Sequence, residues 1–384
     1  MNGLRLFLDG TMARGGGGFT YLANIVPRLL EDEEMEIRLE LRHAPLAEAL
    51  PRSPRLELAL RPPAGWGGRL ADAFLTLGPR ARAWGADLFL SAGELLPPLR
   101  GLPGVACFRN PNLVARPEEP WPPAQRLRLA ALRRLARSTA RRAARVVFVS
   151  RDSARWMGDA LGVDPERRAV IHHGIDPAPF QGTVAAPPLA RPYLLSVSSI
   201  YRYKNFVTLI RAWDLVARAR PGTPDLAIVG DDQDPPYSAA MRRARAACGP
   251  RAERVHLVGA VPYREIPKWY AGARAFVFPS RLETFGHPLL EALAAGIPVV
   301  ASDLPVFREI GGDAVHYVDT TSPEPLAEAL AGVLGDPAAA ARREAGLARV
   351  REFGWDAAAR RLRDLLRTLA AGRRRDRARE GGPP

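Results

Sequence analysis

Short apolar runs alternate with longer stretches rich in alanine, leucine, glutamate and arginine along most of the chain. In the first half, glycine, proline or charged residues bound each run, which is typical of buried strands. We expect strands at 4–9, 35–42, 86–91, 105–109 and 146–150. Because strands alternate with helical stretches, the pattern predicts a parallel α/β sheet.

The alternation pauses at a proline-rich segment and then restarts. Five prolines lie between residues 177 and 192, and proline lacks an amide hydrogen, so we expect a linker there. Beyond it the pattern predicts helices at 206–220 and 288–295, with helical composition continuing to Ala371. The second set of expected strands is 193–197, 226–230, 255–259, 275–279 and 298–302. The tail 373–384 holds five arginines and four Gly or Pro residues, so we expect it to be disordered.

The length of 384 residues fits two domains. The apolar runs are far below the roughly 18 to 20 residues of a membrane-spanning helix. The N-terminal run has no signal-peptide cleavage pattern and is better interpreted as a first strand. The two cysteines, Cys107 and Cys248, lie far apart, which excludes a disulfide framework and fits a reducing cytoplasm.

The net charge of +14 favours polyanionic partners, although a GC-rich genome would also produce many arginines. Eight arginines lie between residues 126 and 145, accompanied by leucines. A basic amphipathic helix there would bind an anionic membrane surface. The alternative is a helix that covers the sheet and turns a basic face to water. No recognised module or aromatic stacking set accompanies the charge, so we do not expect nucleic acid as a partner.

The strongest chemical signal is a pair of glutamates. Glu283 precedes the expected helix at 288–295, and Glu291 lies one turn inside it. Amides at a helix start attract anions, so we expect free backbone amides between Gly286 and Leu290 to face a phosphate, with a carboxylate on either side for sugar hydroxyls. The intervening residues expected to bind substrate are Phe285, Gly286, His287 and Leu289. Considered alone, the spacing of the two glutamates also fits two solvated acids beside an ordinary turn.

The flanking sequence favours a phosphate and sugar site over two solvated acids. Phe278-Pro279-Ser280 precedes the pair, and residues 294–303 (AAGIPVVASD) and Glu309 follow it. This arrangement resembles the donor-binding half of retaining GT-B glycosyltransferases, specifically glycosyltransferase family 4. The resemblance is specific from 193 to 329 and weaker from 5 to 180. It implies two Rossmann-like domains that face a cleft: an acceptor domain at 1–176, a nucleotide-sugar domain at 193–352, and a helix at 353–372 that crosses back to the first domain.

The resemblance also implies roles for individual residues. Lys204 matches a lysine that neutralises the leaving diphosphate, and a cation near a departing phosphate stabilises its charge. The family's second basic residue is replaced here: Ser199 stands at its position and Arg202 lies nearby. Glu291 is expected to hold the ribose hydroxyls, and Glu283 the hydroxyls of the transferred sugar.

Two features of the first domain extend the expected site. Gly16, Gly17 and Gly18 follow the first strand, and glycines let the backbone approach a ligand closely. The resemblance places this loop under the diphosphate and sugar. Asn110 occupies the position of a family histidine that orients the transferred sugar, so we expect its amide to contact the sugar. His172 and His173 are expected to be structural.

No metal or cofactor is expected. Asp232 and Asp234 have the spacing of the D-x-D metal motif of GT-A enzymes, but GT-B enzymes hold the diphosphate with basic residues and helix ends. We therefore interpret both as acids of a loop.

The implied reaction is the retaining transfer of a sugar from a GDP-, UDP- or dTDP-linked donor to a glycan or lipid-linked acceptor. The family's usual work is the synthesis of envelope polysaccharide or glycolipid, which suggests a cytoplasmic enzyme, peripheral on the inner face of the plasma membrane. The alternatives are another GT-B enzyme, such as an epimerase or a phosphorylase, and a non-catalytic relative. An intact glutamate pair argues against the last.

Overall fold

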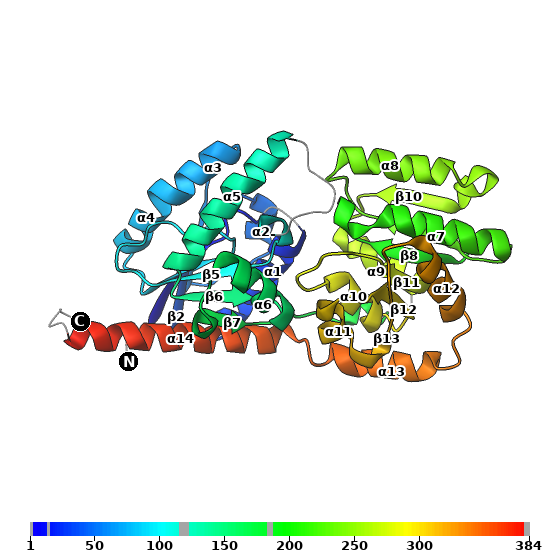
Figure 1. Cartoon of the computed structure of the whole chain (residues 1–384). Helices are drawn as coiled ribbons and strands as arrows, with labels where there is room; N and C mark the ends of the chain where they lie inside the picture. Colours follow the sequence, from blue (N-terminus) through cyan, green and yellow to red (C-terminus); the bar gives the residue numbers. More distant parts are fainter. Residues whose placement is uncertain (1–2, 14–15, 115–122, 183–186, 380–384) are drawn as a thin grey trace. The chain divides into compact units, whose positions relative to one another are not determined.

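The structure is a computed structural model that describes residues 3–13, 16–114, 123–182 and 187–379. The chain forms two compact units (Figure 1). Unit 1 comprises Met1–Gly174 and Trp355–Pro384, and unit 2 comprises Ile175–Gly354. The expected linker at 177–192 falls within the bounds of unit 2, and its residues 183–186 lie outside the described residues.

Unit 1 is built on a seven-stranded sheet with the order β3-β2-β1-β4-β5-β6-β7, and every pairing is parallel. Its strands are β1 (Leu4–Asp9), β2 (Met35–Leu41), β3 (Leu56–Leu60), β4 (Leu88–Ser91), β5 (Gly104–Phe108), β6 (Arg145–Phe148) and β7 (Arg168–Val170). Its helices are α1 (Gly16–Leu29), α2 (Ala44–Glu48), α3 (Trp66–Asp72), α4 (Gly78–Ala83), α5 (Pro123–Arg142), α6 (Arg151–Leu161) and α14 (Trp355–Arg379). A π-helical segment, η1 (Ala73–Leu77), lies between α3 and α4.

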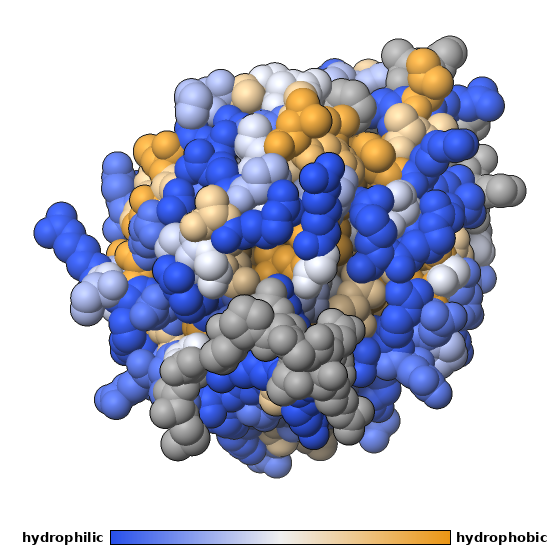
Figure 2. Space-filling view, turned by 90° about the vertical axis from the view of Figure 1, so that its left-hand side faces the viewer, coloured by the Kyte–Doolittle hydropathy of each residue, from blue (hydrophilic) through white to orange (hydrophobic). Residues whose placement is uncertain are grey.

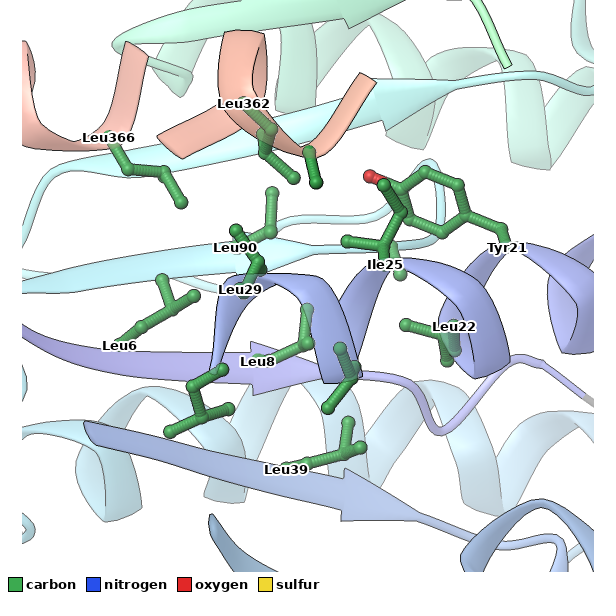
Figure 3. Packing of buried hydrophobic residues seen from close by; sticks show 14 of the residues in the cluster. Leu6, Leu8, Tyr21, Leu22, Ile25, Leu29, Leu39, Leu90, Leu362 and Leu366 are labelled. Atoms are coloured by element: carbon green, nitrogen blue, oxygen red, sulfur yellow. The ribbon is translucent and has the colours of Figure 1, made fainter. Parts of the chain in front are cut away.

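The core of unit 1 joins the two ends of the chain. Figure 3 shows leucines of β1, β2 and β4 packed against α1 and α14, with Leu362 and Leu366 of α14 close to Leu90 of β4. Burial of these side chains is the main favourable term for such packing. His173 contacts the rings of Tyr21 and Trp355 at 5.4 and 5.7 Å between ring centroids, which is the expected structural role.

The expectation of a disordered tail from residue 373 is wrong for its first part. Helix α14 continues to Arg379. Arginine and alanine are good helix formers, so composition alone did not end the helix. Two side chains also fix this end to the sheet: Arg373 donates to the carbonyl of Asp87 at 2.7 Å, and Arg374 to that of Gly3 at 3.0 Å.

Unit 2 contains a second parallel sheet, with the order β10-β9-β8-β11-β12-β13. Its strands are β8 (Tyr193–Val197), β9 (Asp225–Val229), β10 (Val255–Gly259), β11 (Ala273–Phe278), β12 (Val299–Ser302) and β13 (Val315–Val318). Its helices are α7 (Phe206–Ala219), α8 (Pro235–Ala246), α9 (Ile266–Gly272), α10 (His287–Ala294), α11 (Pro305–Gly311), α12 (Pro323–Val333) and α13 (Ala339–Val350). Both sheets confirm the predicted α/β class.

Two further findings bear on the expectations. Cys107 and Cys248 are both buried free thiols. Within the described part of the chain, no helix combines the length and apolar character that crossing a bilayer requires.

Candidate functional site

The candidate donor site lies where two neighbouring strands of unit 2 end. β8 and β11 are adjacent and parallel, so the loops that follow them meet at one edge of the sheet. The amide of Arg281, after β11, donates to the carbonyl of Tyr203, after β8, at 2.8 Å. This edge is where parallel α/β sheets bind ligands.

The hydrogen bond between the two loops brings Lys204 and Glu283 together. The Lys204 ammonium donates to Oε1 of Glu283, and each side chain is only 10% exposed. The hydroxyl of Ser280, which is fully buried, donates to the same oxygen at 3.0 Å. The arrangement thus presents one cation and one carboxylate, already oriented, beside the start of α10.

Helix α10 begins at His287, as expected, one turn before Glu291. Gly286 precedes it with φ +93°, and a Cβ there would come within 2.9 Å of the Phe307 ring, so only glycine fits. The expected free amide at Leu289 is absent, because its N–H donates to the carbonyl of Gly286 at 3.0 Å. The Leu289 side chain is also fully buried. The side chain therefore supports α10, and the expected contact of Leu289 with substrate stays a prediction.

The two aromatic residues of this motif pack together. The rings of Phe285 and His287 meet edge to face at 5.1 Å, and Phe285 also meets Phe353 at 5.9 Å. Phe285 is buried, so it orients the loop before α10. Its expected contact with substrate stays a prediction.

Glu291 is buried, and two tyrosine hydroxyls bind its carboxyl group. Tyr263 donates to Oε1 and Tyr270 to Oε2, both at 3.0 Å. Burial raises the pKa of Glu291 to about 7, because the charged form loses its hydration, while the two hydrogen bonds oppose the rise. Sequence reasoning did not find these tyrosines, since neither lies within the glutamate motif.

Arg202 and Ser199 both contact acids that follow β9. The guanidinium of Arg202 donates to both carboxyl oxygens of Asp234, at 2.8 and 3.1 Å. Ser199 donates to Asp231 at 2.6 Å. Asp234 also accepts from an amide at the start of α8 and is 4% exposed, so it has a structural role. Its neighbour Asp232 accepts the amide of Asp234 at 3.1 Å.

Unit 1 places its expected residues near one another. Gly16, Gly17 and Gly18 form the first turn of α1, directly after the loop from β1. Asn110 follows β5, and its Oδ1 accepts from the amide of Asn112 at 3.0 Å. Arg109, which the sequence did not single out, donates to the carbonyl of Gly17 at 3.5 Å and lies 4.6 Å above the Tyr21 ring. It therefore connects the two predicted segments.

The arginines of α5 have two different kinds of environment. Arg133, Arg137 and Arg142 donate to main-chain carbonyls of Leu113, Ala160 and Leu96, respectively. Other arginines, among them Arg126, Arg134 and Arg141, are exposed. Ala136, Ala140 and Ala143 form the buried side of this region, so the segment packs on unit 1 and also turns arginines to solvent. Its binding to a membrane stays a prediction.

Two parallel sheets in separate units, with the glutamate motif at the start of α10, are the architecture of the GT-B glycosyltransferases. Residues 184–347 match the family model "Glycosyl transferases group 1", and residues 15–179 match "Glycosyltransferase Family 4". The chain belongs to the family 4 glycosyltransferases. Among similar proteins, the lipopolysaccharide core biosynthesis mannosyltransferase LpsB of Rhizobium meliloti is 30% identical over 61% of this chain and 75% of its own length.

Another relative is the D-inositol 3-phosphate glycosyltransferase of Xylanimonas cellulosilytica, 31% identical over 57% of this chain and 56% of its own length. The match thus spans only about half of that protein. Among solved structures, sucrose-phosphate synthase from Thermosynechococcus elongatus superposes with a TM-score of 0.72, at 20% identity over 96% of this chain and 100% of its own. Anabaena Alr3699/HepE in complex with UDP-glucose gives 0.73, at 17% identity over 95% of this chain and 100% of its own. These structures support the fold.

Proposed function

We propose that this protein transfers a sugar from a nucleoside diphosphate sugar to a hydroxyl of a glycan or lipid-linked acceptor, with retention at the anomeric carbon. The observation that carries the proposal is the oriented pair of Lys204 and Glu283 beside the start of α10 and Glu291. The arrangement offers a cation for a diphosphate, and one carboxylate each for the hydroxyls of a sugar and of a ribose.

Each group has a distinct task in this proposal. Lys204 neutralises the departing diphosphate, Glu283 accepts bonds from hydroxyls of the transferred sugar, and Glu291 from those of the ribose. The acceptor oxygen forms a bond to the anomeric carbon while the bond between that carbon and the diphosphate oxygen breaks. The acceptor proton passes to the leaving phosphate oxygen. Asn110 and the glycines of α1 are proposed to contact the sugar and diphosphate from unit 1.

The names of two relatives suggest the acceptor class. LpsB acts in lipopolysaccharide core biosynthesis, and a 37% identical protein of Escherichia coli, matched over 28% of this chain and 29% of its own length, is an O-antigen chain mannosyltransferase. We therefore propose an envelope glycan or glycolipid as acceptor, with the protein bound at the inner membrane surface through the exposed arginines of α5.

The test is an assay of donor hydrolysis and transfer with UDP-, GDP- and dTDP-linked hexoses. At least one donor should release its nucleoside diphosphate, and NMR of the product should show the anomeric configuration of the donor. Lys204→Met and Glu291→Gln should lower the rate, whereas the exposed Arg242→Ala should not. Binding without turnover of any donor would favour a non-catalytic relative, and conversion of the donor to an epimer would favour the epimerase alternative.

A further inference from the structure

The two tyrosines that bind Glu291 differ sharply in their surroundings. Tyr270 lies in α9 and is fully buried, with its ring against those of Phe180 and Phe276 at 5.6 and 5.4 Å. Tyr263 begins the short 3-10 turn η7 (Tyr263–Glu265), and 56% of its surface is exposed. One hydroxyl is therefore part of the core, while the other reaches Glu291 from a solvent-exposed ring.

The hydrogen bonds of Tyr270 fix it in place. Its hydroxyl contacts Oε2 of Glu291 at 3.0 Å and the carbonyl of Pro288 at 3.1 Å, so it connects the carboxyl group to the first turn of α10. Moving it away would leave a buried hydroxyl without a partner, which is costly. Tyr270 therefore keeps the Glu291 carboxyl in one orientation.

Among the described residues, no ring contact and no second hydrogen bond restrains the side chain of Tyr263 in this way. Its hydroxyl donates a hydrogen bond to Oε1 of Glu291, the other oxygen of the carboxyl group. If this hydroxyl leaves, it exchanges one hydrogen bond for another with water, and its ring is already largely in solvent. A ligand hydroxyl that replaces it restores the bond to Glu291, so the exchange costs only the one net hydrogen bond that Tyr263 gives up.

We propose that Tyr263 is a specificity-determining residue of the donor site: its hydroxyl occupies the position on Glu291 that a ribose hydroxyl takes, and it is displaced when a nucleotide binds. Tyr270 is the positioning residue that holds the carboxyl group before and after the exchange. The inference rests on the proposed function, in which Glu291 binds the ribose. It adds that the Tyr263 hydroxyl competes for Glu291 and must be displaced. A ligand with fewer ribose hydroxyls replaces this bond less well, so its affinity is lower.

The test compares Tyr263→Phe and Tyr270→Phe with the wild type in calorimetric titrations of UDP, GDP and their 2′-deoxy analogues. Without the competing hydroxyl, Tyr263→Phe should bind the ribonucleotides about threefold to tenfold more tightly, the range that one net hydrogen bond gives. The increase in the affinity of Tyr263→Phe for the 2′-deoxy analogues should be smaller. Tyr270→Phe should bind more weakly, and the acid limb of its binding curve should move to higher pH, because the carboxylate has lost a permanent donor.

Tyr317→Phe is the matched control, since its hydroxyl contacts only the carbonyls of Phe307 and Gly312 among the described residues. Thermal unfolding of each variant checks that it is folded. If the wild type binds no nucleoside diphosphate, the proposed function and this inference both fall. A second outcome is that the wild type binds a nucleoside diphosphate, Glu291→Gln does not, and Tyr263→Phe binds it with unchanged or weaker affinity. That outcome overturns only the displacement of Tyr263 and leaves the proposed function intact.

Discussion

Lys204 and Glu283 lie 79 residues apart in the chain, yet their side chains form an ion pair that is almost fully shielded from solvent. The Glu283 oxygen that accepts from Lys204 also accepts from Ser280. Because the pair is neutral overall, it attracts a diphosphate that lies nearer to the Lys204 ammonium than to the Glu283 carboxylate. The pair therefore keeps Lys204 oriented before the donor arrives, which reduces the reorganisation needed when the charge develops.

We expect Lys204→Met to lower kcat by a hundredfold or more, the usual result of removing a group that stabilises developing negative charge. The sequence contains only two lysines, so a direct test of contact is available. Mass spectrometry after limited acylation should show that a bound nucleoside diphosphate protects Lys204. Lys268, paired with Glu265 and half exposed, is the internal control. Equal acylation of Lys204 with and without nucleotide would contradict its role.

The sequence predicted the α/β class and most strands because buried parallel strands appear as short apolar runs. β8 and β10 have the predicted bounds. Three strands escaped notice for physical reasons: β7 has only three residues, β3 is an edge strand with exposed positions, and β13 is half exposed along most of its length. Each of these strands contains a charged or polar residue (Arg168, Glu57 or His316), so its apolar run is short or broken.

The site was predictable where a motif carried it. Glu283, Glu291 and Lys204 could be proposed from the sequence because they lie in or near recognisable stretches that follow strands, and their roles stay predictions. Tyr263 and Tyr270 were missed because their relation to Glu291 exists only after η7 and α9 come together with α10. The ion pair between Arg202 and Asp234 is of the same kind, since its partners are 32 residues apart.

Arg202 gives a second prediction, on stability. Its side chain and that of Asp234 are 12% and 3% exposed, so Arg202→Ala leaves a buried carboxylate without its cation. Breaking such a pair costs about 3 kcal/mol or more, and we expect Tm to fall by about 5–10 °C. The exposed Arg242→Ala on α8 is the control. A normal Tm together with weaker nucleotide binding would instead identify Arg202 as the second basic residue of the donor site.

Glu291 gives a prediction about pH. Its pKa is about 7 in the folded protein and near 4.5 in the unfolded chain, so above pH 7 the folded state carries a buried charge at a cost on the order of 3 kcal/mol. The cost disappears as pH falls through this range. Glu291→Gln is neutral throughout. We therefore expect its Tm to exceed that of the wild type at pH 8, and the difference to shrink as pH falls and to vanish below the unfolded pKa near 4.5. A difference independent of pH would show that Glu291 is not the titrating group.

Turnover should not depend on a divalent metal. Lys204 supplies a cation for the diphosphate, and Asp234, half of the D-x-D spacing, is held by Arg202 and by the start of α8. Activity should be the same in excess chelator, and Asp232→Asn should retain the wild-type rate. Loss of activity in chelator that manganese or magnesium restores would show that we misinterpreted the two aspartates.

The final prediction concerns binding to membranes. Unit 1 has three strongly exposed leucines: Leu127 in α5 is 75% exposed, Leu75 in η1 72% and Leu60 in β3 56%. Figure 2 shows one face of the molecule, on which hydrophobic areas are set among hydrophilic side chains. Basic residues near an anionic surface contribute about 1 kcal/mol each, and exposed leucines add to the attraction.

The structure indicates which arginines to change. Arg133, Arg137 and Arg142 bind main-chain carbonyls, so replacing them would disturb the fold. Glutamine at the exposed Arg126, Arg134 and Arg141 should instead weaken co-sedimentation with anionic vesicles at low salt by about a hundredfold, the sum of three such contributions. The same change at three exposed arginines of unit 2, Arg242, Arg243 and Arg264, controls for net charge. Equal losses in both triple variants would mean that charge acts without a defined surface, and no loss in the α5 variant would exclude this helix as the contact.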